Sequence, residues 1–339
     1  MRIKNILIAA AIVCGLCACS KSSDYENSLI IRLGIQTDAY SRGAGSIDDI
    51  TKLADAINNN KDYIGIYGLM TTTPGAASSV LAAEWTQTPF LYNLQVTGCT
   101  SGGALSWTGD YSYPITGESV KFCAYYPWKP TGVSGNTGFT VTENGKSPIV
   151  HFNIEGTDDV MVAAPVVGNS TTSPAPLEFS HLLTQLRFQL IDVSGYFTGY
   201  KIKKMAFKSV NTWTTLDVET GVLSNWRNPA ELIFCEELSN AFYPCTITPS
   251  TSANPQVLNG TIMLEPGHPH FDMTISIEDT GGVVHNYDVR IVPTSAGDNT
   301  FAQERSYLIT LRFENRTDIR LSATVKPWEF GGTGEGIIQ

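Results

Sequence analysis

Few residues of this chain are spaced in a way that could support catalysis. His268, His270 and Asp272 follow one another at intervals of two, so an extended chain would place all three side chains on one side. Such a group could hold a metal ion. The alternative is a polar, proline-containing turn that leads into a strand, and the sequence offers no obvious further ligand elsewhere. We favour the turn, and we expect no metal site and no cofactor.

Two pairs of adjacent acidic residues are also poor candidates for a catalytic site. Asp158 is followed by Asp159, and Glu236 by Glu237. Neighbouring residues on a strand point to opposite faces, so neither pair forms an acid–base couple. His181 lies within an apolar run, which favours a buried histidine over a general base. Because the sequence also contains no G-x-S-x-G, H-E-x-x-H or glycine-rich phosphate-binding motif, we expect a protein that is not an enzyme.

The first residues of the chain have the order of an export signal. Two basic residues precede a short apolar run, and small residues follow up to the sequence L-C-A-C at residues 16–19. The apolar run is too short to span a bilayer. The L-C-A-C ending resembles the lipobox of bacterial lipoproteins, which implies a signal peptide over residues 1–18, a fatty acyl group such as palmitate on Cys19, and a tether over residues 19–27. A plain signal peptide with an incidental cysteine is the alternative.

Composition narrows the class of protein further. The 339 residues carry a formal net charge of −10, and only 16% of them are charged. This acidic balance argues against nucleic acid or an anionic lipid surface as a partner, because both attract basic proteins. The 30 glycines and 17 prolines supply many turns, as in an all-β exported protein. The length suits two domains, each with its own core.

The order of polar and apolar residues predicts strands through most of the chain. Alternation at period two recurs between turn signals such as N-G and G-G, which favours antiparallel β-sandwiches over α/β units. One short helix is expected over residues 46–57, where apolar residues recur at helical spacing. A proline-rich stretch at residues 169–176 is the best candidate for a junction. We therefore expect an N-terminal domain over residues 28–175 and a C-terminal domain over residues 176–339.

Two strands near the ends of the chain share one binary pattern. Both alternate apolar and polar residues, as a strand with one buried face does. The apolar positions are Leu29, Ile31, Leu33 and Ile35 in the first strand, and Ile319, Leu321, Ala323 and Val325 in the last. After the first strand, residues 39–45 (A-Y-S-R-G-A-G) place small residues around Arg42, which is typical of an exposed loop.

Four cysteines would remain after export and acylation. An exported chain allows disulfides, and four cysteines allow three pairings that the sequence does not separate. Cys235 with Cys245 is the most local choice. Cys99 and Cys123 lie on apolar, strand-like stretches and are compatible with buried thiols. Since no C-x-x-C pair is present, a structural zinc site is not expected.

Four segments, taken in order, resemble the fimbrillins, the type V pilins of Bacteroidetes. The lipobox start is one, and residues 122–128 (F-C-A-Y-Y-P-W) are similar to an aromatic strand of that family. Residues 159–164 (D-V-M-V-A-A) with residues 177–188 (L-E-F-S-H-L-L-T-Q-L-R-F) are similar to the region that enters the second domain. The fourth is A-T-V-K-P-W at residues 323–328, followed by a glycine-rich tail.

This resemblance implies two transthyretin-like β-sandwich domains in a fimbrial subunit, which is exported as a lipoprotein to the outer membrane and contributes to adhesion. An arginine-specific protease would cut after Arg42, before Gly43, and release the first strand. The groove left behind would take residues 319–325 of a neighbouring subunit, within a donor segment over residues 317–339. The implied partners are other pilin subunits, in a homopolymer or with anchor and tip subunits, together with the protease and the membrane. A sandwich that lacks one strand exposes apolar side chains and unpaired backbone groups, and an added strand satisfies both.

A surface lipoprotein that binds glycans or another host ligand without polymerising is the alternative function. Aromatic rings can stack on sugar rings, although large aromatic residues in a β-sandwich usually belong to the core. The residues considered for stacking are Trp85, Trp107, Trp213 and Trp226. Several of them exposed on one face would favour this alternative.

Overall fold

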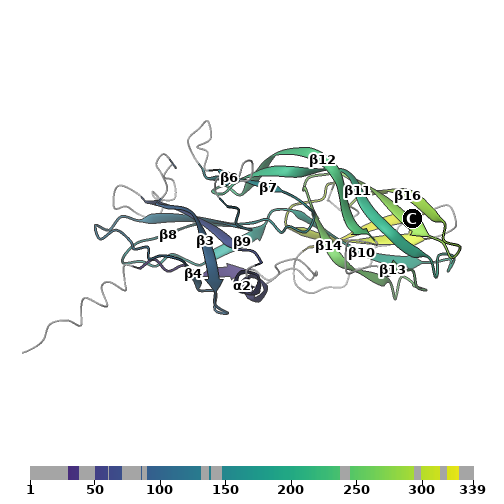
Figure 1. Ribbon diagram of the computed structural model, residues 1–339, viewed down its shortest axis with the longest axis horizontal. Coiled ribbons are helices and arrows are strands. Elements are labelled where there is room, and N and C mark those ends of the chain that lie inside the picture. Colours follow the sequence, from purple (N-terminus) through teal and green to yellow (C-terminus); the bar gives the residue numbers. More distant parts are fainter. Residues whose placement is uncertain are drawn as a thin grey trace, which may run out of the picture.

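The molecule is elongated and almost entirely β, with one helix among the described residues (Figure 1). The computed structural model describes residues 30–37, 50–59, 61–70, 85, 90–130, 137–138, 147–236, 245–293, 299–313 and 319–327. The expected all-β fold class is confirmed. Most strand pairs are antiparallel, and two pairs, β1 with β9 and β10 with β17, are parallel.

The N-terminal half is built on one seven-stranded sheet. In spatial order its strands are β1 (Ile35–Thr37), β9 (Leu177–His181), β8 (Met161–Gly168), β5 (Val120–Tyr126), β2 (Ile64–Met70), β3 (Leu91–Cys99) and β4 (Leu105–Trp107). The helix α2 (Ile50–Asn58) packs beside β3 and buries Leu53, Ala54 and Ile57 in the core of this half. Ile57 lies three positions after Ala54 and four after Leu53, so the three residues share one face of the helix, as the sequence predicts.

The C-terminal half consists of two sheets. The smaller sheet has the order β14 (Gln256–Leu264), β10 (Thr184–Asp192), β17 (Arg305–Phe313) and β18 (Ile319–Pro327). The larger sheet has the order β16 (Val284–Ile291), β15 (Phe271–Glu278), β11 (Lys201–Asp217), β7 (Ile149–Asn153) and β6 (Thr137–Gly138), and β12 (Val222–Glu236) and β13 (Cys245–Thr246) also pair with β11.

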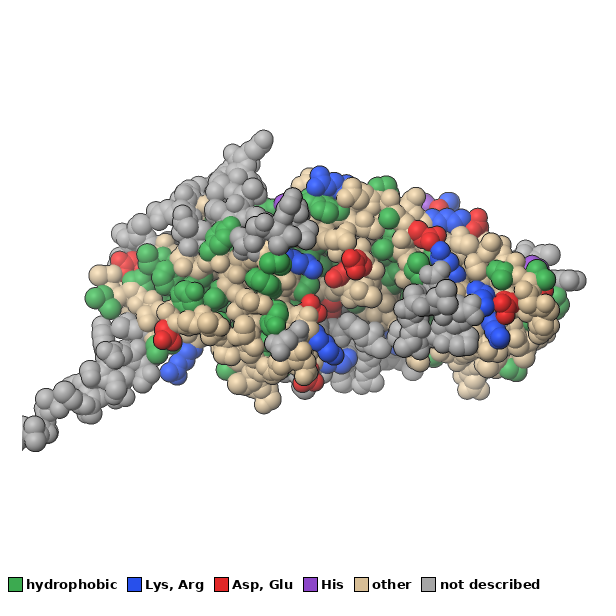
Figure 2. All heavy atoms as spheres, viewed as in Figure 1, with side chains coloured by type: hydrophobic (Ala, Val, Ile, Leu, Met, Phe, Trp, Pro, Cys, Tyr) green, Lys and Arg blue, Asp and Glu red, His purple; other side chains and the backbone are tan. Residues whose placement is uncertain are grey.

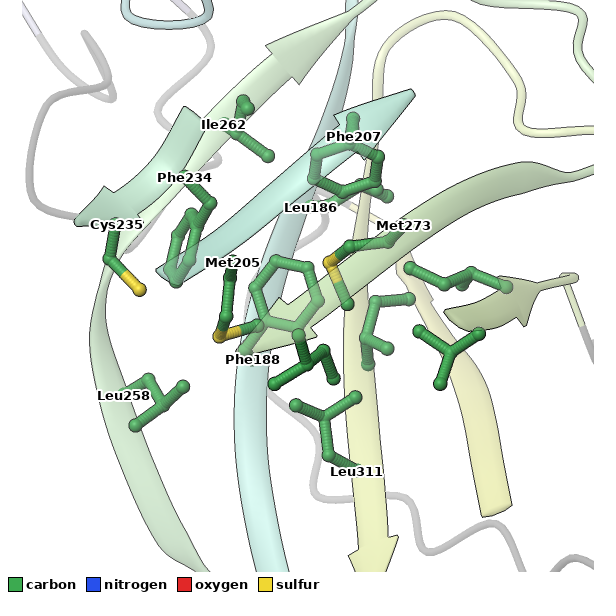
Figure 3. Packing of buried hydrophobic residues seen from close by; sticks show 14 of the residues in the cluster. Leu186, Phe188, Met205, Phe207, Phe234, Cys235, Leu258, Ile262, Met273 and Leu311 are labelled. Carbon is green, nitrogen blue, oxygen red and sulfur yellow. The ribbon is translucent and has the colours of Figure 1, made fainter. Parts of the chain in front are cut away.

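One apolar core holds these two sheets together. It takes Leu186 and Phe188 from β10, Met205 and Phe207 from β11, and Met273 from β15, among others. Figure 3 shows these side chains directed toward one another from strands of both sheets. Strand β15 buries every second residue, as a strand with one covered face does. The C-terminal half is therefore a β-sandwich.

Near the middle of the chain, the order of the strands in the sequence does not follow the division into two halves. β9 lies in the first sheet and β10 in the smaller C-terminal sheet, so the chain passes between sheets at residues 182–183. β7 precedes both strands in sequence but pairs with β11 of the larger sheet. The boundary expected between residues 175 and 176 thus has strands of the first sheet on both of its sides. An apolar cluster that includes Tyr125 of the N-terminal half and Leu216 of the C-terminal half fills the junction.

The surface carries mixed charges. On the face shown in Figure 2, basic and acidic side chains are interspersed over the C-terminal half, and apolar side chains are more frequent over the N-terminal half. Within the described residues, no helix is both long enough and apolar enough to cross a bilayer.

Candidate functional site: the first strand and its slot

Residues 30–37 join the two ends of the N-terminal sheet. On one side they run antiparallel to residues 103–112, with bridges from Ile30 to Ser112 and from Gly34 to Ala104. On the other side β1 runs parallel to β9. We call the two backbone edges that flank this segment, residues 103–112 and β9, the first-strand slot. The segment closes a sheet that would otherwise have two free edges.

Backbone hydrogen bonds hold the segment on both sides. Ile31 N donates to Tyr111 O at 2.9 Å, and Ile35 N donates to Gly103 O at the same distance. Leu33 O accepts from Leu105 N at 3.0 Å. Across the other edge, Leu177 N donates to Gly34 O at 2.8 Å. Removing the segment would leave these backbone groups of the slot without their partners, a state that favours pairing with another strand.

Along the segment, apolar side chains are buried and the charged one is exposed, in the alternation that the sequence predicts. Ile31, Leu33 and Ile35 are 2%, 3% and 4% exposed and belong to the N-terminal core, whereas Arg32 is exposed. Full burial of one such aliphatic side chain stabilises a fold by about 1.5–3 kcal/mol. The three together make the first strand a substantial part of the N-terminal core, and its loss would expose an apolar groove.

Leu33→Ala is expected to destabilise the uncleaved protein by about 3 kcal/mol, because it leaves a cavity in this core. Arg32→Ala is the matched control, and its exposed side chain predicts a change below about 0.5 kcal/mol. Urea unfolding of the two variants would measure the difference. Equal stability of Leu33→Ala and the wild type would contradict the burial of this strand.

The C-terminal strand β18 forms the edge of the smaller sheet. It pairs antiparallel with β17 from Phe313↔Ile319 to Arg305↔Pro327, and it is the last strand in that sheet. Its nine residues are close in number to the eight that lie in the first-strand slot. An edge strand hydrogen-bonds on one side only, so leaving its sheet disrupts a single ladder.

A buried ion pair ties the two halves together. β11 and β12 form a long hairpin whose turn carries Glu219, and Glu219 Oε1 lies 2.6 Å from Lys121 Nζ on β5. Lys121 is fully buried, and its ammonium also lies 5.2 Å from the ring centre of Trp85. A buried lysine needs such a partner because desolvation of its charge is costly. A lysine inside the otherwise apolar strand V-K-F-C-A-Y-Y is the sequence signal that could have indicated this contact.

The sequence matches the fimbrillin-like family over residues 51–328. The chain belongs to this family. Fimbrillin-like proteins are fimbrial and adhesion proteins rather than enzymes, which confirms the expectation of a protein without catalytic activity. Membership supports a pilin-like role in adhesion, a place at the cell surface and assembly with other pilin subunits. No curated protein matches the sequence.

Solved structures show the same fold at low sequence identity. A fimbrial protein from Bacteroides vulgatus is 15% identical with a TM-score of 0.55, and the match covers 88% of this chain and 99% of that one. A candidate cell adhesion protein from Bacteroides uniformis is 17% identical with the same TM-score and the same coverage. Another, from Bacteroides ovatus, is 15% identical with a TM-score of 0.52, covering 89% of this chain and 99% of that one.

Several sites expected in this fimbrillin-like chain lie outside the described residues. They are the acylated Cys19, Leu29 of the first strand, and Arg42 with Gly43 at the cleavage point. For Ile319, Leu321, Ala323 and Val325 the backbone pairing with β17 is described, and the side chains are not. Their roles stay predictions.

Three histidines of this fimbrillin-like protein, His181, His268 and His270, each lie near a different acid. His268 Nε2 lies 2.8 Å from Glu265 Oε2, whereas His270 Nε2 lies 3.9 Å from Asp272 Oδ2. His181 is buried, and its Nδ1 lies 2.7 Å from Asp159 Oδ1. In the described part of the chain, no three His, Cys, Asp or Glu side chains gather in a way that could hold a metal ion.

The four described cysteines are free thiols. Cys99 and Cys123 are buried, at 5% and 0% exposure. Cys235 and Cys245 contribute to the same C-terminal core and both pair with β11, opposite Met205 and Ile202. Burial is the main cause that raises the pKa of Cys235 to about 12, and the neighbouring Cys245 thiol is the second cause. The disulfide between these two residues stays a prediction.

Proposed function

We propose that this fimbrillin-like protein is a subunit of a type V pilus that polymerises by donor-strand exchange. Cleavage after Arg42 releases the first strand, and residues 319–325 of a neighbouring subunit replace it. The subunit travels to the outer membrane as a lipoprotein acylated on Cys19, and an arginine-specific protease carries out the cleavage.

The closure of the N-terminal sheet by residues 30–37 is the observation that carries this proposal. A strand at an ordinary edge could be lost with one ladder disrupted. This strand is paired on both sides and contributes three buried side chains, so its loss opens both edges and the core between them. A strand with the same alternation restores all of these interactions at once.

The pattern and place of β18 support its role as the donor. Its apolar positions Ile319, Leu321 and Ala323 repeat the spacing of Ile31, Leu33 and Ile35. As an edge strand close to the C-terminus, it can leave β17 without drawing another strand with it. The exchange then replaces pairing at one edge within the subunit by pairing at two edges between subunits.

A chain that ends at Arg316 tests the donor role. It keeps the slot and Arg42 but lacks β18, so it should be processed, accept a donor strand from a filament, and then end that filament because it has no strand to donate to a further subunit. Co-expression with the wild-type protein should shorten filaments in electron micrographs in proportion to the truncated fraction. Filaments of normal length would contradict the proposal.

A point variant covers the case in which the truncated chain does not fold because β17 is uncovered. Leu321→Asp places a charge on the apolar face of the donor, and Ser322→Asp places the same charge on the polar face. We expect assembly to fail with the first substitution and to persist with the second. Equal assembly by both variants would overturn the assigned donor face.

A further inference from the structure

An open cleft of about 860 Å³ lies on the larger C-terminal sheet, where β7, β11 and β12 run side by side near the junction of the two halves. Its walls include the rings of Trp213 and Trp226, with Thr220, Ser224 and Asn225 at the turn end. The volume falls within the range of small-molecule sites, about 300–1,000 Å³. None of the interactions proposed for pilus assembly uses this cleft.

Three side chains form a stacked row along the cleft wall. The ring of His151 on β7 lies 4.9 Å from that of Trp213 on β11, with an angle of 26° between the planes. Arg227 on β12 pairs directly opposite Trp213, and its guanidinium carbon lies 3.5 Å from the Trp213 ring centre. Because β7 and β12 flank β11 on opposite sides, the indole lies between the imidazole and the guanidinium. Trp213 is therefore a support for Arg227 rather than a free platform for a sugar ring.

Stacking fixes the plane of the Arg227 guanidinium and leaves its N–H edge available. Arg227 is exposed, and no described carboxylate lies within the 4.0 Å that defines an ion pair with it. A guanidinium held flat presents a planar fork that matches a carboxylate in two parallel hydrogen bonds. The row thus orients one cationic fork in a protein whose overall charge is negative.

The other ionisable groups of the cleft do not compete for this fork. Asp217 accepts hydrogen bonds from the Ser147 hydroxyl and from the backbone N–H groups of Glu219 and Thr220. Burial lowers the pKa of His151, and the nearby Arg227 lowers it further, so the imidazole is neutral at physiological pH. Asp217 keeps its negative charge, but its Oδ1 is already engaged by donors of the protein, and Arg227 is the one cationic side chain among the described residues that line the cleft.

We propose that this cleft binds a saccharide that carries a carboxylate, such as a terminal sialic acid or a uronic acid. The carboxylate pairs with the N–H edge of Arg227. The hydroxyl groups of Thr220 and Ser224 and the amide of Asn225 are suited to sugar hydroxyls. Trp226, which is half-buried against the junction cluster, adds apolar surface to the lining. A polar, shallow site of this kind with one charged anchor favours a sugar acid over an apolar ligand.

Binding of 3′-sialyllactose and of lactose to the full folded chain tests this proposal. The two probes differ by the sialic acid, so saturation-transfer NMR and calorimetry should detect the first and find at least tenfold weaker binding of the second. Sodium acetate is the third probe, and it should not displace 3′-sialyllactose at equal concentration. Equal binding of the two sugars, no binding of 3′-sialyllactose, or displacement by acetate would each overturn the proposal.

Arg227→Gln removes the charge of the exposed anchor and should weaken 3′-sialyllactose binding at least tenfold with an unchanged melting temperature. Arg227→Lys should also weaken it, because an ammonium cannot form the paired hydrogen bonds of the planar fork. Arg290→Gln, on β16 and paired with Asp272, is the control outside the cleft and should bind like the wild type. Unchanged affinity in Arg227→Gln would contradict the proposed anchor. Filament assembly should be normal in all three variants, which separates this site from the proposed pilus function.

Discussion

Arg42→Ala is expected to leave the protein folded and acylated but unable to form filaments. The substitution removes the side chain that an arginine-specific protease would recognise, so the first strand stays in its slot. Occupied by residues 30–37, the slot has no free backbone edge to pair with a donor. The expected result is a complete loss of filaments in electron micrographs, with a normal amount of surface protein.

Two matched substitutions sharpen this prediction. Arg42→Lys keeps the positive charge and should also block assembly, because the protease selects arginine. Arg32→Ala changes an exposed arginine within the first strand itself and should assemble normally. Filaments from Arg42→Ala would contradict the proposed processing site. Loss of filaments from Arg32→Ala would indicate that the protease cuts after Arg32 instead of Arg42.

Glu219→Leu is expected to destabilise the protein by about 3 kcal/mol, because it takes away the carboxylate 2.6 Å from a fully buried ammonium. Lys121→Met should cost less, about 1 kcal/mol, since the Glu219 side chain is 20% exposed and can be hydrated when its partner is lost. Urea unfolding followed by fluorescence would measure both variants.

The double variant Lys121→Met with Glu219→Leu decides whether the pair acts as a unit. It should be close in stability to Lys121→Met alone, because no buried charge remains. Glu231→Leu is the surface control. Its partner Lys204 is 30% exposed, so the expected change is below about 1 kcal/mol. Additive effects in the double variant would contradict direct coupling across the junction.

Local pattern was enough to predict much of the secondary structure. The alternation in V-K-F-C-A-Y and in T-I-S-I predicted β5 and β15, and the helical spacing of Leu53 and Ile57 predicted α2. The buried face of the first strand followed from the same alternation. In each case the signal lies within about ten residues. Alternation predicted the covered face of β15, whereas all seven residues of β5 are buried because both of its faces are covered.

Pairing partners could not be predicted in this way. Period two shows that Leu33 is buried but not that its strand lies between residues 103–112 and β9, which are distant in sequence. For the same reason the sequence did not show that β7 crosses to the larger C-terminal sheet. The contact between Lys121 and Glu219 spans 98 positions, and only the length of the β11–β12 hairpin brings its turn to β5.

The tryptophans illustrate the limit for binding sites. From the sequence, each of the four tryptophans considered for stacking could be either a core residue or an exposed ring that stacks on a sugar. The structure buries Trp85 completely, while Trp213 lies in a row between His151 and Arg227. That row depends on the register of three strands, because a shift of one residue in β12 would turn Arg227 to the other face.

The N-terminus of subunits in sheared filaments tests the central claim most directly. Free α-amino groups should be labelled on the intact protein, and digestion should then use a protease that does not cut after arginine, so that a start at residue 43 cannot arise from the digestion. We predict a labelled N-terminus at Gly43 in the filament fraction and acylated Cys19 in the unassembled membrane fraction. Filament subunits that begin at acylated Cys19 and retain residues 30–37 would contradict removal of the first strand.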